Sequence, residues 1–346
     1  MNKEDLRSLN LDELKSTAAD FGEKPFRGDQ VYEWLHKKLS DDFSEMTNVP
    51  KSFRNCLAEK YELYNLEIIR ILKDQEDGTC KFLLKTFDDN VIESVLMKYE
   101  HGFSACISSQ VGCRMGCSFC ASTIGGRIRN LTAGEMAAQI YAMQKSEGVR
   151  ISNIVVMGTG EPFDNYESFI RFYEIITGKE GLNISGRNIT VSTCGIVEKI
   201  RELADRHFAL TLAISLHAPN DELREKIMPI AKKYRIADIL EACDYFFERT
   251  GRRVTFEYSL IAGVNDSAEC AGELSKLLKN KNSHVNLIPV NPVKERDYKR
   301  SGNDKISAFK KLLEKNGINV TIRRGMGKNI DAACGQLRRS YINGEA

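Results

Sequence analysis

The spacing of apolar residues along the chain changes twice. Up to about residue 62, apolar residues recur every three or four positions, which is typical of short amphipathic helices. Over residues 66–97 the pattern becomes short β-like runs separated by turn signals such as Asp77-Gly78, which predicts a three-stranded meander. From residue 103 onward, strand-like runs alternate with helix-like stretches. This alternation predicts parallel βα units.

The expected elements define an α/β fold with a partial barrel. Strands are expected at 104–108, 154–157, 189–192, 209–216, 254–260, 285–289 and 320–322, with helices at 132–147, 166–177, 197–206, 235–249, 267–280 and 304–316. Six or seven units, not eight, predict an open (β/α)6-type barrel. We expect a small N-terminal helical module over residues 1–64, a β-meander linker over 65–98 and a core barrel with a C-terminal extension over 99–346. The module is expected to hold three helices, near residues 6–14, at 26–39 and from Pro50.

Composition excludes several classes of protein. Apolar residues make up 42% of the 346 residues, which is enough for a sizeable core and excludes a disordered linker. The sequence has no run of 18 apolar residues, and residues 1–5 do not resemble a signal peptide, so we expect a cytoplasmic protein without membrane contact. The 50 basic and 48 acidic residues leave a formal charge of +2, which still allows a local basic face for nucleic acid.

Three of the ten cysteines, Cys113, Cys117 and Cys120, crowd into one short segment. Such crowding favours a metal or cluster site over a disulfide framework. Iron–sulfur clusters take thiolate ligands, and three thiolates leave one iron of a 4Fe-4S cube open to another ligand. A zinc site completed by a distant side chain is the alternative.

Other polar residues follow the predicted strands. In βα folds, functional groups gather at the C-terminal ends of the strands. The residues at those positions, apart from the cysteine loop, are Gly160, Glu161, Ser192, Ser215, Leu216, His217 and Asn291. We therefore expect these residues to share one rim of the barrel.

Longer strings carry a family resemblance. The Cys-x3-Cys-x2-Cys loop after the first barrel strand resembles the radical S-adenosylmethionine (SAM) superfamily. The strings over 106–113, 129–132, 215–218, 263–266 and 331–337 are similar to those of the RlmN/Cfr family of RNA adenine methyltransferases, and so are 26–28 and 46–48. The resemblance covers nearly the whole chain.

The resemblance implies cofactors and roles for particular residues. A 4Fe-4S cluster would be held by Cys113, Cys117 and Cys120, and SAM, two molecules per turnover, would be bound by the open iron and by the rim residues named above. Cys334 would carry a methyl group taken from the first SAM. Cys106 would release the product by forming a disulfide with Cys334. Glu93 would accept the proton lost from the base, although Cys106 is an alternative acceptor. Without the resemblance, Glu93 reads as a solvated strand carboxylate and Cys334 as a buried small apolar residue.

The resemblance also implies the reaction and the partners. The product would be 2-methyladenine in 23S rRNA and in tRNA, made by a monomer that takes electrons from a donor such as flavodoxin. Adenine C2 is electron-poor, so a radical route suits it better than polar methyl transfer. Methylation at C8 of the same rRNA adenine is the nearest alternative. A non-catalytic RNA-binding protein with a structural zinc is an alternative from another class.

Overall fold

The protein is built on one ten-stranded mixed sheet. The computed structural model describes residues 3–293, 295–330 and 335–344. The strands of this sheet are β3 (Glu67–Lys73), β4 (Cys80–Lys85), β5 (Val91–Tyr99), β6 (Gly102–Cys106), β9 (Ile151–Val156), β10 (Ile189–Thr193), β11 (Thr211–Ser215), β12 (Val254–Leu260), β13 (Ser283–Pro289) and β14 (Val320–Ile322). They lie in the order β14-β13-β12-β11-β10-β9-β6-β5-β4-β3.

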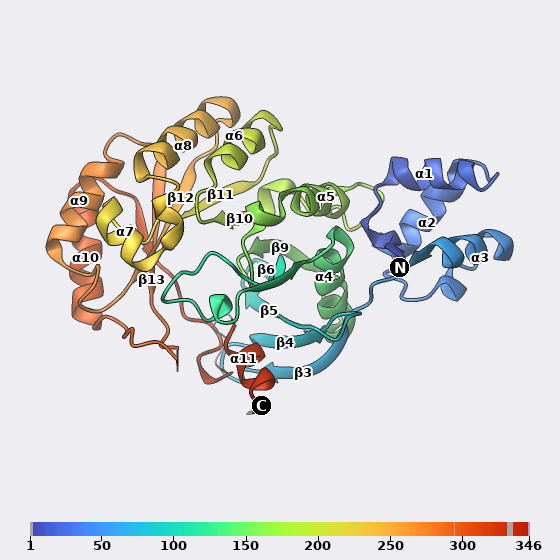
Figure 1. Ribbon diagram of the computed structural model, residues 1–346, viewed down its shortest axis with the longest axis horizontal. Helices are drawn as coiled ribbons and strands as arrows, with labels where there is room; N and C mark the ends of the chain where they lie inside the picture. Colours follow the sequence, from blue (N-terminus) through green and yellow to red (C-terminus); the bar gives the residue numbers. More distant parts are fainter. Residues whose placement is uncertain (1–2, 294, 331–334, 345–346) are drawn as a thin grey trace.

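The part of the sheet from β6 to β14 is parallel and forms the partial barrel. Every pair between these strands runs in parallel. The connecting helices lie outside the curved sheet (Figure 1). They are α4 (Ala133–Glu147), α5 (Tyr166–Thr177), α6 (Val197–Asp205), α7 (Asp221–Ile227), α8 (Ile236–Thr250), α9 (Ala268–Leu278) and α10 (Asn303–Lys315). The expected α/β barrel is thus confirmed, and α5, β12 and β14 have the predicted bounds.

The core of the barrel forms where these helices pack on the strands. Phe169 and Phe172 of α5 and Phe246 of α8 are fully buried beside apolar strand residues. Each such side chain contributes on the order of 2 kcal/mol by leaving water. This packing fixes the strand ends on which the polar rim depends.

The expected meander is present, and it extends the barrel sheet. β3, β4 and β5 pair antiparallel with one another, and β5 pairs antiparallel with β6. Two turns follow the signals in the sequence, with Gly78 and Asp89 both at positive φ. Because β5 lies directly beside the first barrel strand, residues of the meander reach the edge of the barrel interior.

The N-terminal residues form a separate small core. It contains the 3-10 helix η1 (Leu6–Ser8), α1 (Leu11–Asp20), α2 (Phe26–His36), α3 (Lys51–Lys60) and a parallel pair of two-residue strands, β1 (Glu4–Asp5) and β2 (Tyr61–Glu62). The helix expected near residues 6–14 begins only at Leu11. Asn10 caps it: its side chain accepts from the Glu13 N–H, and Glu13 accepts from the Asn10 N–H.

Polar contacts fix this small core on the barrel. The Thr132 hydroxyl donates to Asp5 Oδ2 at 2.7 Å, at the start of α4. His36 Nδ1 and the Tyr141 hydroxyl lie 2.8 Å apart, and the Tyr32 hydroxyl donates to the Ile175 carbonyl at 3.1 Å. All three contacts are buried or partly buried, so β1 is held at the start of α4, and α2 is held against α4 and α5 (Figure 1).

Several short elements were not predicted. They are the hairpin of β7 (Gln110–Gly112) and β8 (Arg127–Asn130), α7, and α11 (Gln336–Ile342) near the C-terminus. Each is too short to show a clear apolar period. Among the described helices, none combines the length and the apolar character that a membrane span requires.

Candidate functional site

The three clustered cysteines lie on a loop whose base is closed by the β7–β8 hairpin. The Cys113 N–H donates to the Gly126 carbonyl at 3.1 Å. Gly112 has a φ of +76°, and a Cβ at this position would lie 2.0 Å from the Gly126 carbonyl oxygen. Only glycine allows this crossing, so Gly112 sets where the cysteine loop begins.

The thiols of this loop face the ends of the parallel strands across a cavity of about 260 Å³. Cys113, Cys117 and Cys120 line one side. The other side carries the residues expected from the strand ends, which are Gly160, Glu161, Ser192, Ser215 and His217. The barrel therefore brings the cysteine loop and most of the predicted rim to one place.

The cysteine side chains suit an iron–sulfur cluster. Burial raises the pKa of the Cys113 thiol to about 12 and that of Cys117 well above its ordinary value, so coordination must displace their protons. In the described ranges, no three His, Cys, Asp or Glu side chains converge closely enough to hold a single metal ion. A cube gives each thiolate its own iron, so three separate thiols on one side of a cavity fit it.

Gly160 and Glu161 form a rigid corner after β9. Glu161 is buried; its Oε1 accepts from the Phe163 N–H at 3.0 Å and its Oε2 from the Cys194 N–H at 2.8 Å. Burial raises the pKa of this carboxyl. Gly160 has a φ of +112°, and a Cβ there would lie 2.7 Å from the Ser109 hydroxyl oxygen. The corner thus presses against the start of β7, and its carboxylate ties the ends of β9 and β10 together.

Ser192, Ser215 and His217 continue the polar wall. The two serine hydroxyl oxygens lie 3.3 Å apart. His217 Nδ1 accepts from the Ser259 N–H at 3.0 Å, so the ring carries its proton on Nε2. Burial lowers the pKa of His217 to about 3, and Phe119 of the cysteine loop packs edge-on to its ring. This histidine is a neutral hydrogen-bond donor at ordinary pH.

Two of the expected rim residues lie away from the cavity wall. Leu216 is fully buried in the core, and its N–H donates to the Glu257 carbonyl at 3.1 Å. Asn291 follows β13 and is exposed. Neither is among the residues that line the cavity, so their contact with SAM stays a prediction.

Glu93 is buried on β5, which corrects its interpretation as a solvated strand carboxylate. Its side chain is 4% exposed and pairs with Lys81 of β4, whose Nζ lies 3.3 Å from Oε2. Glu93 Oε2 also accepts from the Gly335 N–H at 2.6 Å, and Oε1 accepts from the Arg338 N–H at 2.5 Å. Cys334 lies outside the described residues, but the amide that follows it in the chain is bound to Glu93.

Cys106 lies at the end of β6, one strand from Glu93. It is paired in register with Val95 of β5 and Val155 of β9. Its side chain is buried in a small apolar cluster with Val95 and Met97, against which Met326 packs. The disulfide between Cys106 and Cys334 stays a prediction.

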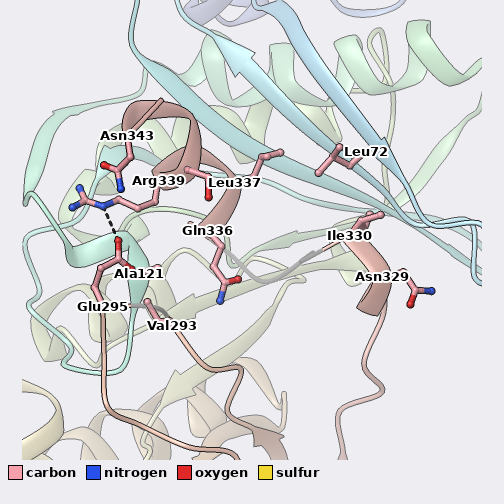
Figure 2. Close-up of a pocket in the computed structure, with 11 residues that line it drawn as sticks. Leu72, Ala121, Val293, Glu295, Asn329, Ile330, Gln336, Leu337, Arg339 and Asn343 are labelled. Carbon is pink, nitrogen blue, oxygen red and sulfur yellow. Dashed lines mark hydrogen bonds and ion pairs between the residues drawn. The ribbon is translucent and has the colours of Figure 1, made fainter. Parts of the chain in front are cut away.

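A second cavity of about 390 Å³ lies beside α11 (Figure 2). Leu72, Val293, Ile330 and Leu337 supply apolar walls, while Asn329, Gln336 and Asn343 supply amides and Arg339 pairs with Glu295 at 3.0 Å. Ala121, which directly follows the cysteine loop, lines this second cavity, and its neighbour Ser122 lines the first. The two cavities are therefore neighbours across one turn of chain.

Two acidic residues of the site were not predicted. Glu257 of β12 lines the first cavity between Ser215 and Asn286 in strand register, and it accepts from the Asn286 amide at 2.9 Å. Asp164 accepts from Gln110 Nε2 and Arg114 Nε, both at 3.0 Å, and so ties the cysteine loop to the segment after β9. The signal for Asp164 was its place just after the Gly-rich corner. Glu257 lies inside a strand and gave no such signal.

Family models match most of the chain. Residues 107–270 match the model of the radical SAM superfamily. Residues 4–63 match the model of the ribosomal RNA large subunit methyltransferase N-terminal domain. The two matches fall on the barrel and on the small N-terminal core described above.

Individual relatives are similar over nearly their whole length. The chain is 61% identical over 341 residues to a protein of Lachnoclostridium phytofermentans named dual-specificity RNA methyltransferase RlmN, covering 99% of this chain and 96% of that protein. It is 59% identical to a protein of the same name from Lachnospira eligens, covering 98% and 97%. A solved radical SAM methyltransferase from Sphaerobacter thermophilus superposes with a TM-score of 0.92 at 44% identity, covering 96% of this chain and 98% of that one.

Proposed function

Because this chain belongs to the RlmN family of RNA methyltransferases in the radical SAM superfamily, we propose that it methylates C2 of adenine in 23S rRNA and in tRNA. It is a methyltransferase enzyme, and the superfamily uses SAM and a 4Fe-4S cluster. The proposal is carried by one observation: the three cysteines and the polar strand ends line the same cavity.

Cys113, Cys117 and Cys120 hold the cluster in this proposal, and the opposite wall holds SAM. The bound cluster and SAM supply a carbon radical, which adenine C2 requires because it is electron-poor. The Gly160–Glu161 corner and the serine pair offer acceptors and donors for the polar groups of SAM. His217 offers a neutral donor, which does not repel a sulfonium.

Cys334 carries the methyl group in this proposal. One SAM methylates its thiol, and a second SAM is used to activate that methyl group for addition to adenine. The hydrogen bond from the Gly335 N–H to Glu93 supports this role, because it places a buried carboxylate beside the residue that follows Cys334. Glu93 is then the acceptor of the C2 proton.

Cys106 releases the product. Its thiol loses its proton and attacks the sulfur of Cys334, so that a disulfide forms as the bond from that sulfur to the methylene group on the base breaks. The released carbon keeps the electron pair of the broken bond and takes up a proton, which completes the methyl group. The electrons that restart the cycle come from a donor such as flavodoxin. Glu93 and Cys106 lie on neighbouring strands, β5 and β6, which supports their action at one base.

The substrate adenine must be unstacked to reach such an interior site. Loops of RNA allow this more readily than regular helices. The second cavity, with its amides and apolar walls beside α11, supports entry of a base from that side (Figure 2). Arg114 of the cysteine loop pairs with Asp164 and is 58% exposed, so its outer face is open to phosphates.

Mass spectrometry of the modified nucleoside tests the proposal. Reconstituted protein is incubated anaerobically with methyl-deuterated SAM, a reductant and either an rRNA fragment or a tRNA. We expect 2-methyladenosine from both RNAs. A product methylated at C8 instead would contradict the proposed position, and label in only one RNA would contradict dual specificity.

Two variants separate the roles of the cysteines. Cys334→Ala is expected to abolish turnover and to lack the methyl group that peptide mass analysis finds on the wild-type Cys334 peptide. The matched control is Cys270→Ala, a cysteine on α9 that lies outside both cavities. A colourless protein with one zinc and no response to SAM would favour the RNA-binding alternative.

A further inference from the structure

Arg224 on α7 is a buried cation that has no carboxylate partner among the described residues. Its side chain is fully buried. Its guanidinium donates to four backbone carbonyls, those of Cys194 at 2.6 Å and of Leu216, Ser215 and Tyr234 at 3.2 Å. Among the described residues, no Asp or Glu forms an ion pair with it, and Asp221 interacts only at longer range.

A buried charge of this kind is expensive unless an opposite charge is nearby. Burial lowers the pKa of the Arg224 guanidinium, and it outweighs the opposite effects of Cys194, Cys117 and Asp221. The four carbonyl contacts satisfy its hydrogen bonds but contribute no negative charge. A negatively charged group bound in the neighbouring cavity would supply a compensating charge.

The position of Arg224 relates it to the cysteine loop. It lies one helical turn before Ile227, whose carbonyl accepts from the Ser118 N–H of that loop at 2.9 Å. Ile227, Met228 and Cys194 form one apolar cluster against which Cys117 and Phe119 pack. Two carbonyls that Arg224 binds belong to Cys194 and Ser215, which line the first cavity. The guanidinium thus lies directly behind the wall that faces the thiols.

We infer that Arg224 is a positioning residue that sets the reduction potential of the 4Fe-4S cluster by placing a fixed positive charge behind it. The inference rests on the proposed function, since it requires the cluster at Cys113, Cys117 and Cys120. When an external donor supplies one electron, the cube with its three thiolates becomes more negative by one charge. A fixed cation in a low-dielectric setting stabilises that reduced form and raises the potential.

The chemistry explains why a guanidinium is used here. A guanidinium presents several donors in a rigid planar fork, which suits the four carbonyl oxygens that surround it. Its donors also hold the chain where β10 and β11 end, because Cys194 directly follows β10 and Ser215 is the last residue of β11. One side chain therefore holds the cavity wall and supplies its charge.

The test is a redox titration of the reconstituted cluster, followed by electron paramagnetic resonance of the reduced form. The variants are Arg224→Gln and Arg224→Met, which are neutral, and Arg224→Lys, which keeps a charge. At a fixed applied potential, we expect the ratio of reduced to oxidised cluster to be at least tenfold lower in the neutral variants. For a one-electron couple, this corresponds to a reduction potential that is lower by about 59 mV. Arg224→Lys is expected to stay near wild type.

Arg252→Gln is the matched control. Arg252 Nε donates to the Leu210 carbonyl at 2.6 Å, just before β11 and at the opposite end of the strand from the cavity. Its loss removes a partly buried guanidinium–carbonyl bond without changing the charge behind the cluster. The reduction potential of the cluster in Arg252→Gln is therefore expected to match that of the wild type.

Each outcome decides the inference. Neutral variants that hold the cluster at the wild-type potential overturn it. Loss of the cluster in both Arg224→Gln and Arg224→Lys also overturns it, because the guanidinium is then only a structural cross-link. If Arg224→Gln loses the cluster while Arg224→Lys keeps it at the wild-type potential, the inference is supported, because a positive charge is then sufficient at this position. A wild-type protein that binds no cluster contradicts the proposed function instead.

Discussion

Lys81 and Glu93 form an ion pair that is closed to solvent on both sides, with side chains 0% and 4% exposed and Nζ 3.3 Å from Oε2. The pair spans β4 and β5, and the same carboxylate binds the first amides of α11. A strand residue in the first third of the chain therefore holds the C-terminal segment against the barrel. The proposed proton acceptor is at the same time the anchor of the residue that follows Cys334.

Replacement of Lys81 by methionine leaves the buried Glu93 carboxylate without the ammonium group that pairs with it. We expect the free energy of unfolding to fall by about 3 kcal/mol, since breaking a buried pair leaves an uncompensated charge. Urea unfolding measures this change. The double variant Lys81→Met/Glu93→Gln is expected to recover part of the loss, because it removes the stranded charge.

Lys85→Met is the control for this prediction. Lys85 also lies on β4 and pairs with Glu67, but that pair is open to solvent, with side chains 35% and 64% exposed. Its loss should leave the free energy of unfolding almost unchanged. If the two lysine substitutions lowered the free energy of unfolding equally, the buried pair would contribute no more to stability than the exposed pair.

Gly160→Ala should damage the cavity without removing any polar group. The new Cβ would lie 2.7 Å from Ser109 Oγ and from Gln110 Cβ, at a φ of +112°. Such overpacking typically costs about 1–3 kcal/mol. We expect a lower melting temperature and SAM binding weakened by about tenfold, or 1.4 kcal/mol, measured by equilibrium dialysis on the cluster-loaded protein.

The matched control is Gly272→Ala, on helix α9. Nothing lies within 4 Å of a Cβ at Gly272, so the helix should gain up to about 1 kcal/mol. SAM binding should not change. Unaltered SAM affinity in Gly160→Ala would mean that the corner after β9 is not part of the SAM site.

Asp164→Asn should loosen the cysteine loop. Asp164 is nearly buried and accepts from Arg114, Arg127 and Gln110, and a neutral amide cannot accept as many charged donors. Groups that orient metal ligands typically change metal affinity by about tenfold or more when they are lost. We expect iron to leave the reconstituted protein about tenfold faster in the presence of a chelator.

Asp244→Asn serves as the control for iron loss. Asp244 pairs with Lys281 on the surface, with its side chain 52% exposed, and lies outside the first cavity. The Asp244→Asn variant should lose iron at the wild-type rate. If Asp164→Asn did the same, the salt bridges around Asp164 would have no part in holding the loop.

The sequence predicted what depends on local pattern. The strand Val254–Leu260 and the helix Tyr166–Thr177 follow from continuous apolar periods, and parallel strands place their C-terminal ends together. For that reason the cysteine loop, Glu161 and His217 could be expected on one rim before the fold was known. The structure brings them to one cavity.

Other parts of the site depend on contacts between distant segments. Glu93 binds Gly335, and no local pattern relates a strand carboxylate to an amide so far along the chain. Arg224 looks like an ordinary charged residue of a short helix until its burial is known. Helix α11 is seven residues long, and it is held by Glu93 and not by an apolar period of its own.

His36 makes the fold sensitive to acid. It is buried between α2 and α4, with Nδ1 2.8 Å from the Tyr141 hydroxyl and its ring 4.5 Å from the Tyr32 ring. Burial, and then the charge of Arg7, lower the pKa of His36 from 6.5 to about 3. Between these two values the unfolded chain binds a proton that the folded chain does not, so stability falls as the pH falls below 6.5.

His36→Gln removes the group that binds this proton in the unfolded chain. Between about pH 7.5 and about pH 5, the histidine accounts for a loss of about 2 kcal/mol in the free energy of unfolding. We expect urea unfolding to show that much less acid destabilisation in the variant than in the wild type. His207→Gln is the control, because His207 is exposed and takes no part in the contact between α2 and α4. A parallel pH dependence in wild type and His36→Gln would mean that the folded protein takes up the proton at His36 without opening the contact between α2 and α4.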